Sequence, residues 1–461
     1  MSRIAMLIAA AVLSACALGP NYQRPEIETP AAYRWQAAAD APGSLGDKAW
    51  WYLYRDPELN KLIEAAIAQN LDLRIAAARV AQAQATVGPA RLLLLPQISA
   101  RGGIERERAS VERASGSDRT ETTQTAALDL SWELDLWGRL RRESEAARAE
   151  LLAAEYAHRG VMVSLVAEVA TNWFRLANLH EQLRVTLATT ETRAQFLQLT
   201  QAQAERGTVS GLDVATAEAQ LAQARVSIPE FERQVAQTEH ALALLLGRNP
   251  GDFPRPELQR GETTPEVPAG LPSTLLARRP DILQAEQGLV AANARIGSAK
   301  AALFPTISLT GSFGSLSGDM STLFTGPAQT WSAGVNLLQP LLDAQRNLYR
   351  VDLADARKAE ALAVYEKAVR NGFREVADAL VARQKLAEVE RAQAELVGAQ
   401  QRAEEIATAR YKVGYSSYFD VINADRDLFN AKLALSSARF NSQLALVQLY
   451  RALGGGWQVA P

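Results

Sequence analysis

Alternating hydrophobic and polar positions predict four β-strands in the chain. Between residues 128 and 135, leucine or tryptophan at each even position alternates with a polar residue at each odd position. The same period-2 pattern recurs in three other segments, in weaker form at residues 98–107 and clearly at residues 306–313 and 332–337. Such alternation gives a strand one apolar and one polar face. Because residues 108–122 and 315–330 are polar and contain Gly, Ser or Thr, we expect each to form a hairpin loop.

Two long segments without proline predict two long helices. Proline is absent from residues 139–206 and from residues 345–413. At 1.5 Å per residue, about 68 residues of helix extend for about 100 Å. Apolar residues recur in both segments at steps of four, three and four, at Met162, Val166, Val169 and Trp173 and at Val369, Phe373, Val376 and Leu380. This narrow stripe predicts helix-on-helix packing of the coiled-coil type.

Each long helix leads through a glycine into a shorter, returning helix. Gly207 and Gly414 stand where the long helices are expected to end, as C-cap glycines. Asp213 and Asp420 stand where the returning helices are expected to begin, as N-caps. Pro229 is expected to kink the first returning helix. Two further helices are predicted before the strand pairs, at residues 57–87 and 271–301.

The predicted elements occur twice in the same order. With an offset of 207 residues, residues 207–214 align with residues 414–421. A period of this length is too long for a solenoid repeat, so each copy is an architectural half. We assign repeat 1 to residues 57–267, repeat 2 to residues 268–457, and a short tail to residues 458–461.

The N-terminus has the features of an exported lipoprotein. A basic residue, Arg3, precedes an apolar stretch at residues 4–13 and the sequence Leu-Ser-Ala-Cys, which ends at the single cysteine, Cys16. This arrangement resembles the bacterial lipobox. The resemblance implies a signal peptide of residues 1–15 and a lipid-anchored segment of residues 16–56. It also implies an S-diacylglycerol and an N-palmitoyl group on the cysteine, and an alanine as the following residue favours the outer membrane.

The remaining composition limits how the chain can cross a membrane. After residue 16 there is no run of 18 apolar residues, the length that a transmembrane helix requires. Any crossing would therefore be made by β-strands. Since a closed barrel requires about eight strands, the four strands of one chain do not suffice. If these strands span the membrane, several chains must share one barrel.

Charge and motifs exclude several other classes of function. Basic and acidic residues are nearly balanced, at 49 and 51, and are scattered along the predicted helices, so we expect no nucleic-acid partner. The histidines are too widely spaced for a metal motif and there is no second cysteine, so no metal site is predicted at His158, His180 or His240. No nucleophile elbow or zinc-protease motif occurs, and we expect no enzyme activity and no cofactor besides the lipid.

Three motifs join the lipobox and the duplicated order of elements. They are Trp-Glu-Leu-Asp-Leu-Trp-Gly-Arg at residues 132–139, Gln-Pro-Leu-Leu-Asp at residues 339–343 and Ala-Leu-Gly-Gly-Gly-Trp at residues 452–457. Together these features resemble the TolC-like outer-membrane factors, and most closely the OprM/NodT-type efflux outer-membrane lipoproteins. The resemblance implies a mainly α fold with a membrane β part. It further implies a homotrimer with four strands per chain in one twelve-stranded β-barrel, continued by a long periplasmic α-helical barrel.

The resemblance also implies a function and its partners. The chain would be the exit duct of a tripartite efflux system, passing drugs or other small toxic compounds across the periplasm and the outer membrane. Its partners would be a periplasmic adaptor, an inner-membrane pump of the resistance-nodulation-division (RND) class, and outer-membrane lipid. Two alternatives remain: a lipid-anchored periplasmic adaptor or coiled-coil scaffold without a pore, and a type I protein-secretion duct. The strands argue against the first alternative, and the terminal motifs favour the efflux family over the second.

Residues of a periplasmic gate follow from the same resemblance. Asp420 matches a first gate aspartate, whereas Asn423 replaces a second one, so the ring of charges around a trimer axis is expected to be weaker. Phe419 matches an apolar constriction, and Arg426 matches a basic gate residue. Without the resemblance, Asp420 indicates only the start of a helix.

A second set of positions implies a latch between helices. Asp213 and Tyr411 match a pair that holds the closed tip together in the family. Ser416 replaces a basic latch residue found in some members, which removes one link. The resemblance implies passive opening, in which the pump supplies the energy and the inner helices of repeat 2 untwist.

Overall fold

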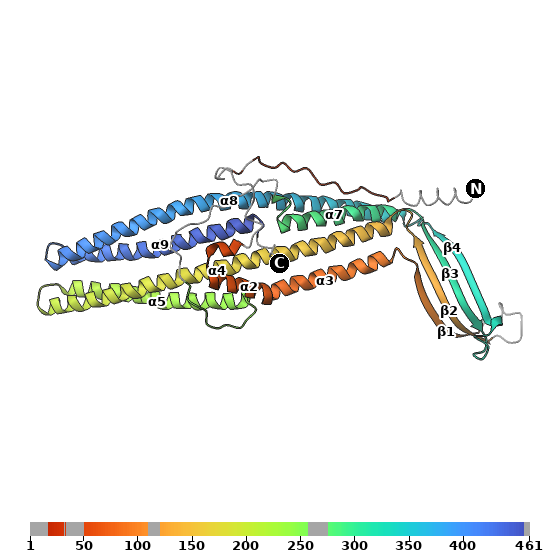
Figure 1. The fold of residues 1–461 in the computed structure, drawn as a ribbon, viewed down its shortest axis with the longest axis horizontal. Coiled ribbons are helices and arrows are strands. Elements are labelled where there is room, and N and C mark those ends of the chain that lie inside the picture. Colours follow the sequence, from red (N-terminus) through yellow and green to blue (C-terminus); the bar gives the residue numbers. More distant parts are fainter. Residues whose placement is uncertain (1–16, 32, 34–49, 109–119, 257–274, 456–461) are drawn as a thin grey trace. The chain divides into compact units, whose positions relative to one another are not determined.

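The computed structural model describes residues 17–31, 33, 50–108, 120–256 and 275–455, and the structural statements below concern these residues. They are mostly helical, with one small sheet (Figure 1). Repeat 1 contains α2 (Pro57–Gln69), α3 (Leu71–Leu92), β1 (Gln97–Arg108), β2 (Thr120–Leu134), α4 (Arg139–Glu205) and α5 (Gly211–Leu245). Repeat 2 contains α7 (Pro280–Ala301), β3 (Thr306–Ser317), β4 (Gln329–Leu338), α8 (Ala344–Lys412) and α9 (Tyr418–Ala452).

The residues group into two compact units, and each unit takes segments from both repeats. Unit 1 comprises the described residues of Met1–Ile27, Ala78–Glu155 and Gln284–Lys367. Unit 2 comprises those of Glu28–Ala77, Tyr156–Leu283 and Ala368–Pro461. Unit 1 therefore holds all four strands, whereas unit 2 holds the turn ends of the long helices.

The four predicted strands form one antiparallel sheet in unit 1. The order is β1-β2-β3-β4, so β2 and β3 join the two repeats edge to edge. β2 begins at Thr120, eight residues before its clear alternation starts. Of the first predicted loop, residues 108–122, residues 109–119 lie outside the described residues and the others belong to β1 and β2. The second loop contains a short 3-10 helix, η3 (Gly326–Ala328).

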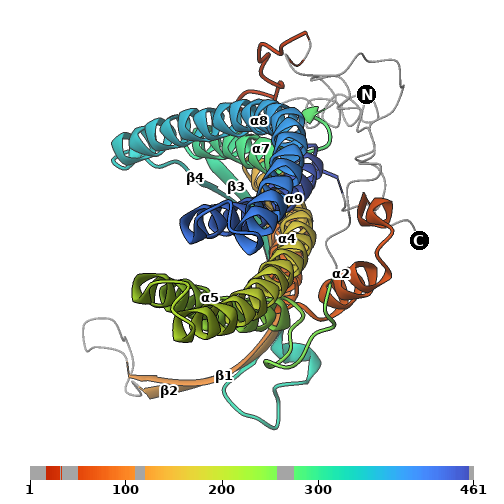
Figure 2. The same cartoon turned by 90° about the vertical axis from the view of Figure 1, so that its left-hand side faces the viewer.

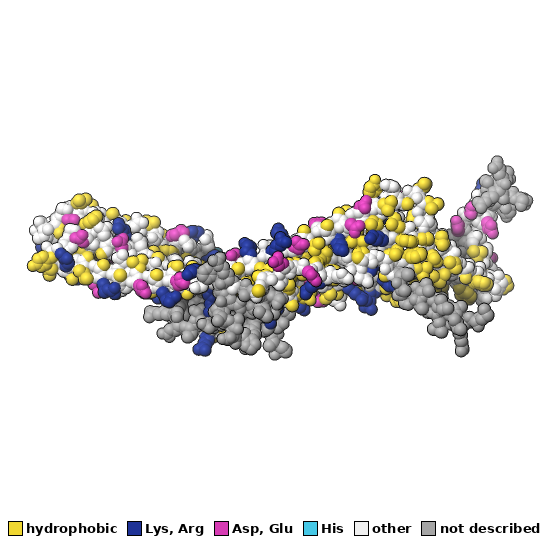
Figure 3. All heavy atoms as spheres, turned by 90° about the horizontal axis from the view of Figure 1, so that it is seen from above, with side chains coloured by type: hydrophobic (Ala, Val, Ile, Leu, Met, Phe, Trp, Pro, Cys, Tyr) yellow, Lys and Arg dark blue, Asp and Glu magenta, His cyan; other side chains and the backbone are white. Residues whose placement is uncertain are grey.

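The register of the sheet gives it one apolar and one polar face, as the alternation predicted. Leu128 pairs with Phe313, which pairs with Trp331, and these apolar side chains share one face. On the opposite face, Asp129 pairs with Ser312. Phe313 and Trp331 are 62% and 76% exposed in the single chain. Hydrophobic side chains gather over the strands and the start of α8 in unit 1 (Figure 3).

A glycine allows β2 and β3 to approach closely at the boundary between the repeats. Gly314 pairs with Ala127. A Cβ atom added to this glycine would lie 2.2 Å from the carbonyl oxygen of Ala126 and 2.5 Å from the Cα atom of Ala127. Because real Cβ atoms do not approach backbone atoms this closely, a larger residue would push the two strands apart.

The segment that follows the predicted lipidation site is bound to the helices of unit 1. The backbone N–H of Leu18 donates to the carbonyl oxygen of Trp137, where β2 leads into α4. Arg142 donates from Nε to the carbonyl oxygen of Leu18. Arg24 donates from Nε to Oε1 of Glu286 on α7, over 2.8 Å. These contacts hold residues 18–24 along the helices.

The core of unit 2 is aromatic and contains the predicted apolar stripes. Trp50 stacks on Tyr450 with 5.1 Å between ring centroids, and Trp173 donates from Nε1 to Asp56. The core also includes most of the residues predicted from the helical spacing, with Val166, Val169, Val369, Val376 and Leu380 all buried. α4 and α8 are unbroken helices of 67 and 69 residues, which confirms the long helices predicted from the absence of proline.

The structure corrects two predicted helices. The helix expected over residues 57–87 is divided at Asn70, whose extended backbone ends α2. Its side chain stabilises the break, because Nδ2 donates to the carbonyl oxygen of Leu245 and Oδ1 accepts from the backbone N–H of Leu73. The helix expected over residues 271–301 begins only at Pro280, because residues 276–278 form a turn and residues 271–274 lie outside the described residues.

Two further observations concern the helices. α5 is continuous through Pro229, and the kink predicted there stays a prediction. Among the described residues, no helix combines the length and the apolar character needed to cross a membrane.

Candidate functional site

The candidate site lies at the two glycine turns of unit 2, which Figure 2 shows from their turn ends. Gly207 joins α4 to α5 with a φ of 72°, and Gly414 joins α8 to α9 with a φ of 81°. This left-handed conformation favours glycine. In each turn the residue after the glycine donates to the last turn of the long helix, from Thr208 to Gln203 and from Tyr415 to Arg410. The predicted C-caps are therefore confirmed.

Both returning helices begin with a capping box. Ser210 and Ser417 are the N-caps, and each accepts a hydrogen bond from the backbone N–H of the aspartate three residues later. Asp213 and Asp420 accept in return from the backbone N–H of the serines. The prediction that the aspartates themselves are the N-caps is wrong, because each occupies the third helical position. The two repeats share this geometry down to individual hydrogen bonds.

The carboxylate of Asp420 is held by several hydrogen bonds. Oδ2 accepts from the hydroxyl of Ser416 over 2.7 Å, and from the hydroxyl and the backbone N–H of Ser417. These bonds, with that from Ser416 the largest contribution, lower the pKa of the Asp420 carboxyl. Ser416, which stands in place of a basic latch residue, thus donates a hydrogen bond to the candidate gate residue Asp420. The Asp420 carboxyl is charged at neutral pH.

The other candidate gate residues lie along the first turns of α9. Phe419, Asn423 and Arg426 are spaced by four and three residues, so they share one helix face. Phe419 is 69% exposed, and its counterpart in repeat 1, Leu212, is also exposed. Arg426 pairs with the neighbouring Asp427 over 3.0 Å. One chain therefore presents a bulky apolar and a basic side chain on the same face of α9.

The predicted latch residues lie near one another but have other hydrogen-bond partners. The hydroxyl of Tyr411 donates to Oε1 of Gln203 on α4, over 2.9 Å. Oδ2 of Asp213 accepts from the hydroxyl and backbone N–H of Ser210. Burial, followed by the charge of Asp213, raises the pKa of Tyr411. The tyrosine thus links α8 to α4 through Gln203, and a direct latch with Asp213 stays a prediction.

An aromatic cluster next to the turns was not predicted from the sequence. Phe196 on α4 stacks on Tyr418 of α9 with 5.0 Å between centroids and 7° between planes. Tyr411 contacts both rings at 5.7 and 5.8 Å. Burial raises the pKa of Tyr418 to about 12, so all three rings are neutral at physiological pH. The cluster packs the first helical hairpin, α4–α5, against the second, α8–α9.

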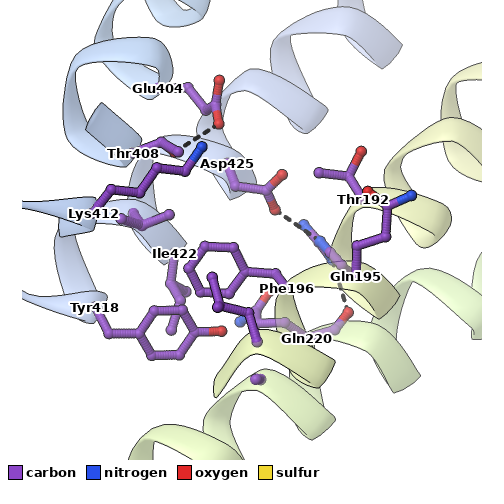
Figure 4. A pocket seen from close by; sticks show the side chains of 14 residues that line it. Thr192, Gln195, Phe196, Gln220, Glu404, Thr408, Lys412, Tyr418, Ile422 and Asp425 are labelled. Carbon is purple, nitrogen blue, oxygen red and sulfur yellow. Dashed lines mark hydrogen bonds and ion pairs between the residues drawn. The ribbon is translucent and has the colours of Figure 1, made fainter. Parts of the chain in front are cut away.

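A partly buried ion pair and a cavity lie beside this cluster (Figure 4). Nε of Arg193 on α4 lies 2.8 Å from Oδ2 of Asp425 on α9. The adjoining cavity has a volume of about 280 Å³, and its lining includes Phe196, Tyr418 and Ile422. Neither charged residue stands out in the sequence, because they are 232 positions apart.

The outer membrane efflux protein family matches the chain twice, over residues 62–248 and 271–455. This chain belongs to that family. It is 38% identical to the probable efflux pump outer membrane protein TtgC of Pseudomonas putida, over 99% of this chain and 96% of the relative. It is 36% identical to the outer membrane protein OprJ of Pseudomonas aeruginosa, over 98% and 96% of the two chains. It is 34% identical to the cation efflux system protein CusC of Escherichia coli, over 97% of each.

Solved outer-membrane channels have the same fold as this family member. The outer-membrane channel OprN superposes with a TM-score of 0.90 at 31% identity, over 96% of this chain and all of the other. The open state of the MtrE channel of Neisseria gonorrhoeae superposes with a TM-score of 0.85 at 31% identity, over 96% and 99% of the two chains. The expected fold class, outer-membrane location and efflux-channel function are therefore confirmed. The family comprises channels and is not an enzyme family, whereas the roles of the individual gate residues stay predictions.

Proposed function

We propose that this outer-membrane channel is the homotrimeric exit duct of a tripartite system driven by an RND pump, and that it exports small organic compounds. Relatives named as antibiotic and toluene efflux pump outer membrane proteins of Pseudomonas putida are each 38% identical to it over 99% of its length. A solvent efflux pump outer membrane protein is 37% identical over 98%. This similarity, which extends over nearly the whole length of the chain, is the observation that carries the proposal.

The sheet supports the trimer. Among the described residues, β1 and β4 each pair along one edge only, and the apolar face of the sheet is exposed in the single chain. An open sheet edge in lipid would leave backbone donors and acceptors without partners. In a trimer, β4 of one protomer would pair with β1 of the next, which gives twelve strands in a closed barrel. The exposed Phe313 and Trp331 would then face lipid.

The candidate gate follows from the trimer. Three copies of Asp420 around one axis would form a ring of carboxylates, and three copies of the exposed Phe419 would form an apolar constriction. Arg426 would add a basic group, and the neutral Asn423 would leave the ring with one carboxylate per chain. The channel opens passively in this proposal, when the adaptor and the pump displace the turn ends.

A lipid anchor at Cys16 completes the proposal. The cysteine lies outside the described residues, but Ala17 is its neighbour in the chain. The contacts of Leu18, Arg142 and Arg24 hold the following residues at the end of β2 and along α7. An S-diacylglycerol and N-palmitoyl group at the cysteine would bind outer-membrane lipid there.

The test is complementation in a Gram-negative host that lacks its own exit duct. The host would express a periplasmic adaptor and an RND pump of a related efflux system, with or without the chain, and growth would be measured on toluene and on antibiotics. We expect the chain to restore resistance to both. Failure to restore resistance, with the trimer present in the outer membrane, would contradict the proposal.

Cation export is the second candidate, because of the 34% identity to CusC. One observation favours organic compounds: the sequence identity to the antibiotic and toluene efflux relatives, 38%, is higher than the identity to CusC. Growth of the same strains on copper and silver salts distinguishes the two candidates, since only a cation duct restores resistance to those salts.

A further inference from the structure

We propose that Arg193 and Asp425 form the lock that holds the two helical hairpins of unit 2 together and fixes the rotation of α9 at the gate. The inference rests on the proposed function, since it concerns how the exit duct stays closed. Its members are positioning residues, because they act on the gate through α9.

The contacts of Arg193 join three helices. Its Nε atom donates to Oδ2 of Asp425 on α9 over 2.8 Å, and its Nη1 atom donates to the carbonyl oxygen of Gln220 on α5 over 2.9 Å. The guanidinium lies 5.3 Å from the ring centroid of Phe429, also on α9. One side chain on α4 thus binds its own hairpin and the opposite one, with two hydrogen bonds and a cation–π contact.

Burial distinguishes this pair from the exposed ion pairs of unit 2. The side chain of Arg193 is 6% exposed and that of Asp425 is 23% exposed. In contrast, Arg233 and Glu230 on α5 are each about half exposed and lie three residues apart on one helix. Exposed pairs of that kind contribute little, whereas removal of one partner of a buried pair leaves an uncompensated charge. Separation of the hairpins would therefore leave the buried guanidinium of Arg193 without the carboxylate that compensates its charge.

Two cavities adjoin the pair. The cavity of about 280 Å³ adjoins it near the turns, and a second cavity of about 200 Å³ also borders Asp425. Thr192, Glu404 and Asp425 line both cavities. The first cavity is lined partly by apolar residues that pack the hairpins together, among them Phe196, Tyr418 and Ile422, so the ion pair acts beside these apolar contacts.

The position of Asp425 on α9 connects the lock to the gate. Asp425 directly precedes Arg426, and Phe419, Asn423 and Arg426 form one helix face. Successive residues of an α-helix are separated by about 100° around its axis. When the Asp425 carboxylate points to α4, the face with Phe419 and Arg426 is turned away from Asp425 by about 100–120°. Rotation of α9 during opening would break the contact with Arg193.

The test measures the open probability of the purified full-length trimer in planar bilayers. The variants are Asp425→Asn, Arg193→Glu, and the charge-swapped double variant Arg193→Glu/Asp425→Arg. The control is Arg233→Glu, at the exposed pair. Asp425→Asn removes the charge of the acceptor and should raise the open probability by about tenfold. Arg193→Glu also removes the bond to Gln220 and places two carboxylates side by side, so its open probability should rise by at least as much. The swap should recover part of that change, and the control should stay within about twofold of the unmodified protein.

The outcomes separate the lock from the proposed function. If the unmodified trimer passes no current after opening by its adaptor, the proposed function fails. If the unmodified trimer conducts and Asp425→Asn has the same open probability, the lock is refuted. An absence of any recovery in the double variant would refute it as well, because a general packing defect is not repaired by exchanging the charges. Asp425→Asn is nearly isosteric and keeps the assay interpretable if Arg193→Glu does not assemble.

Discussion

The contact between Tyr411 and Gln203 provides a direct test of how the turn ends are held together. Tyr411→Phe removes the phenolic hydroxyl, which donates to Oε1 of Gln203 over 2.9 Å, and keeps the ring against Phe196 and Tyr418. A neutral hydrogen bond of this kind contributes about 1 kcal/mol net. We therefore expect the ratio of open to closed channels to rise about fivefold.

The assay is single-channel recording combined with a double-mutant cycle. Gln203→Ala removes the other partner, so the double variant with Tyr411→Phe should cost less than the sum of the single changes, by about 1 kcal/mol. Asp213→Ala is the matched control. Its carboxylate is bound to Ser210, and its effect should add to that of Tyr411→Phe within about 0.5 kcal/mol. Coupling of Tyr411 to Asp213 instead of Gln203 would refute this assignment and support the latch that the family resemblance implies.

Three further predictions concern the anchor, the sheet and the gate. Cys16→Ser should abolish labelling by radioactive palmitate while trimers still form, and unchanged labelling would contradict the lipobox. Gly314→Ala should destabilise the folded trimer by about 1–3 kcal/mol in denaturant unfolding, because its Cβ atom would lie 2.2 Å from the carbonyl oxygen of Ala126. The control is Gly103→Ala, whose Cβ atom would have no other atom within 4 Å and should not destabilise the trimer. Equal effects of the two variants would refute the close approach at Gly314. The Asp420 carboxyl, which belongs to the capping box, has a folded-state pKa below its ordinary value of 3.8. The stabilisation of α9 by this carboxylate is therefore fully present above pH 3.8 and is lost as the pH falls through the lower folded-state pKa. Carbonyl-labelled NMR titration should show Asp420 ionised at pH 3.8 to a larger extent than Asp in a peptide, and a midpoint at or above 3.8 would contradict this.

The sequence predicted the strands where the pattern of side chains itself defines them. β3 and β4 agree with the alternation because large apolar residues occupy one face of both. The start of β2 was missed, since residues 120–127 contain no large apolar side chain and therefore show no alternation. The division at Asn70 depends on Leu245, which is 175 residues away, so the local sequence does not indicate it.

The candidate site divides in the same way between local and long-range features. The capping boxes follow from Ser-x-x-Asp, which occurs at Ser210 and again at Ser417, and a closer reading of this motif would have given the N-caps correctly. The aromatic cluster and the pair of Arg193 and Asp425 have no such local signal. They arise only when the two hairpins pack, because the stacking of Phe196 on Tyr418 and the ion pair of Arg193 with Asp425 each join residues from different repeats.

The differences between the repeats gain meaning from the structure. Ile422 is buried in the cluster with Tyr418, whereas the corresponding Ala215 has a much smaller side chain. Thr216, which corresponds to Asn423, bonds to its own helix through the carbonyl oxygen of Leu212. The capping geometry is thus common to both turns, and the side chains proposed to line the gate belong to repeat 2.

The central claim, that this chain is the exit duct of an efflux system, is tested most directly by efflux from preloaded cells. A host without its own exit duct, but with a periplasmic adaptor and an RND pump of a related efflux system, would be loaded with a fluorescent hydrophobic dye and then re-energised. We predict rapid loss of dye only when the chain and an active pump are both present. The same rate of loss without the chain, in cells that contain the active pump and adaptor, would contradict the account.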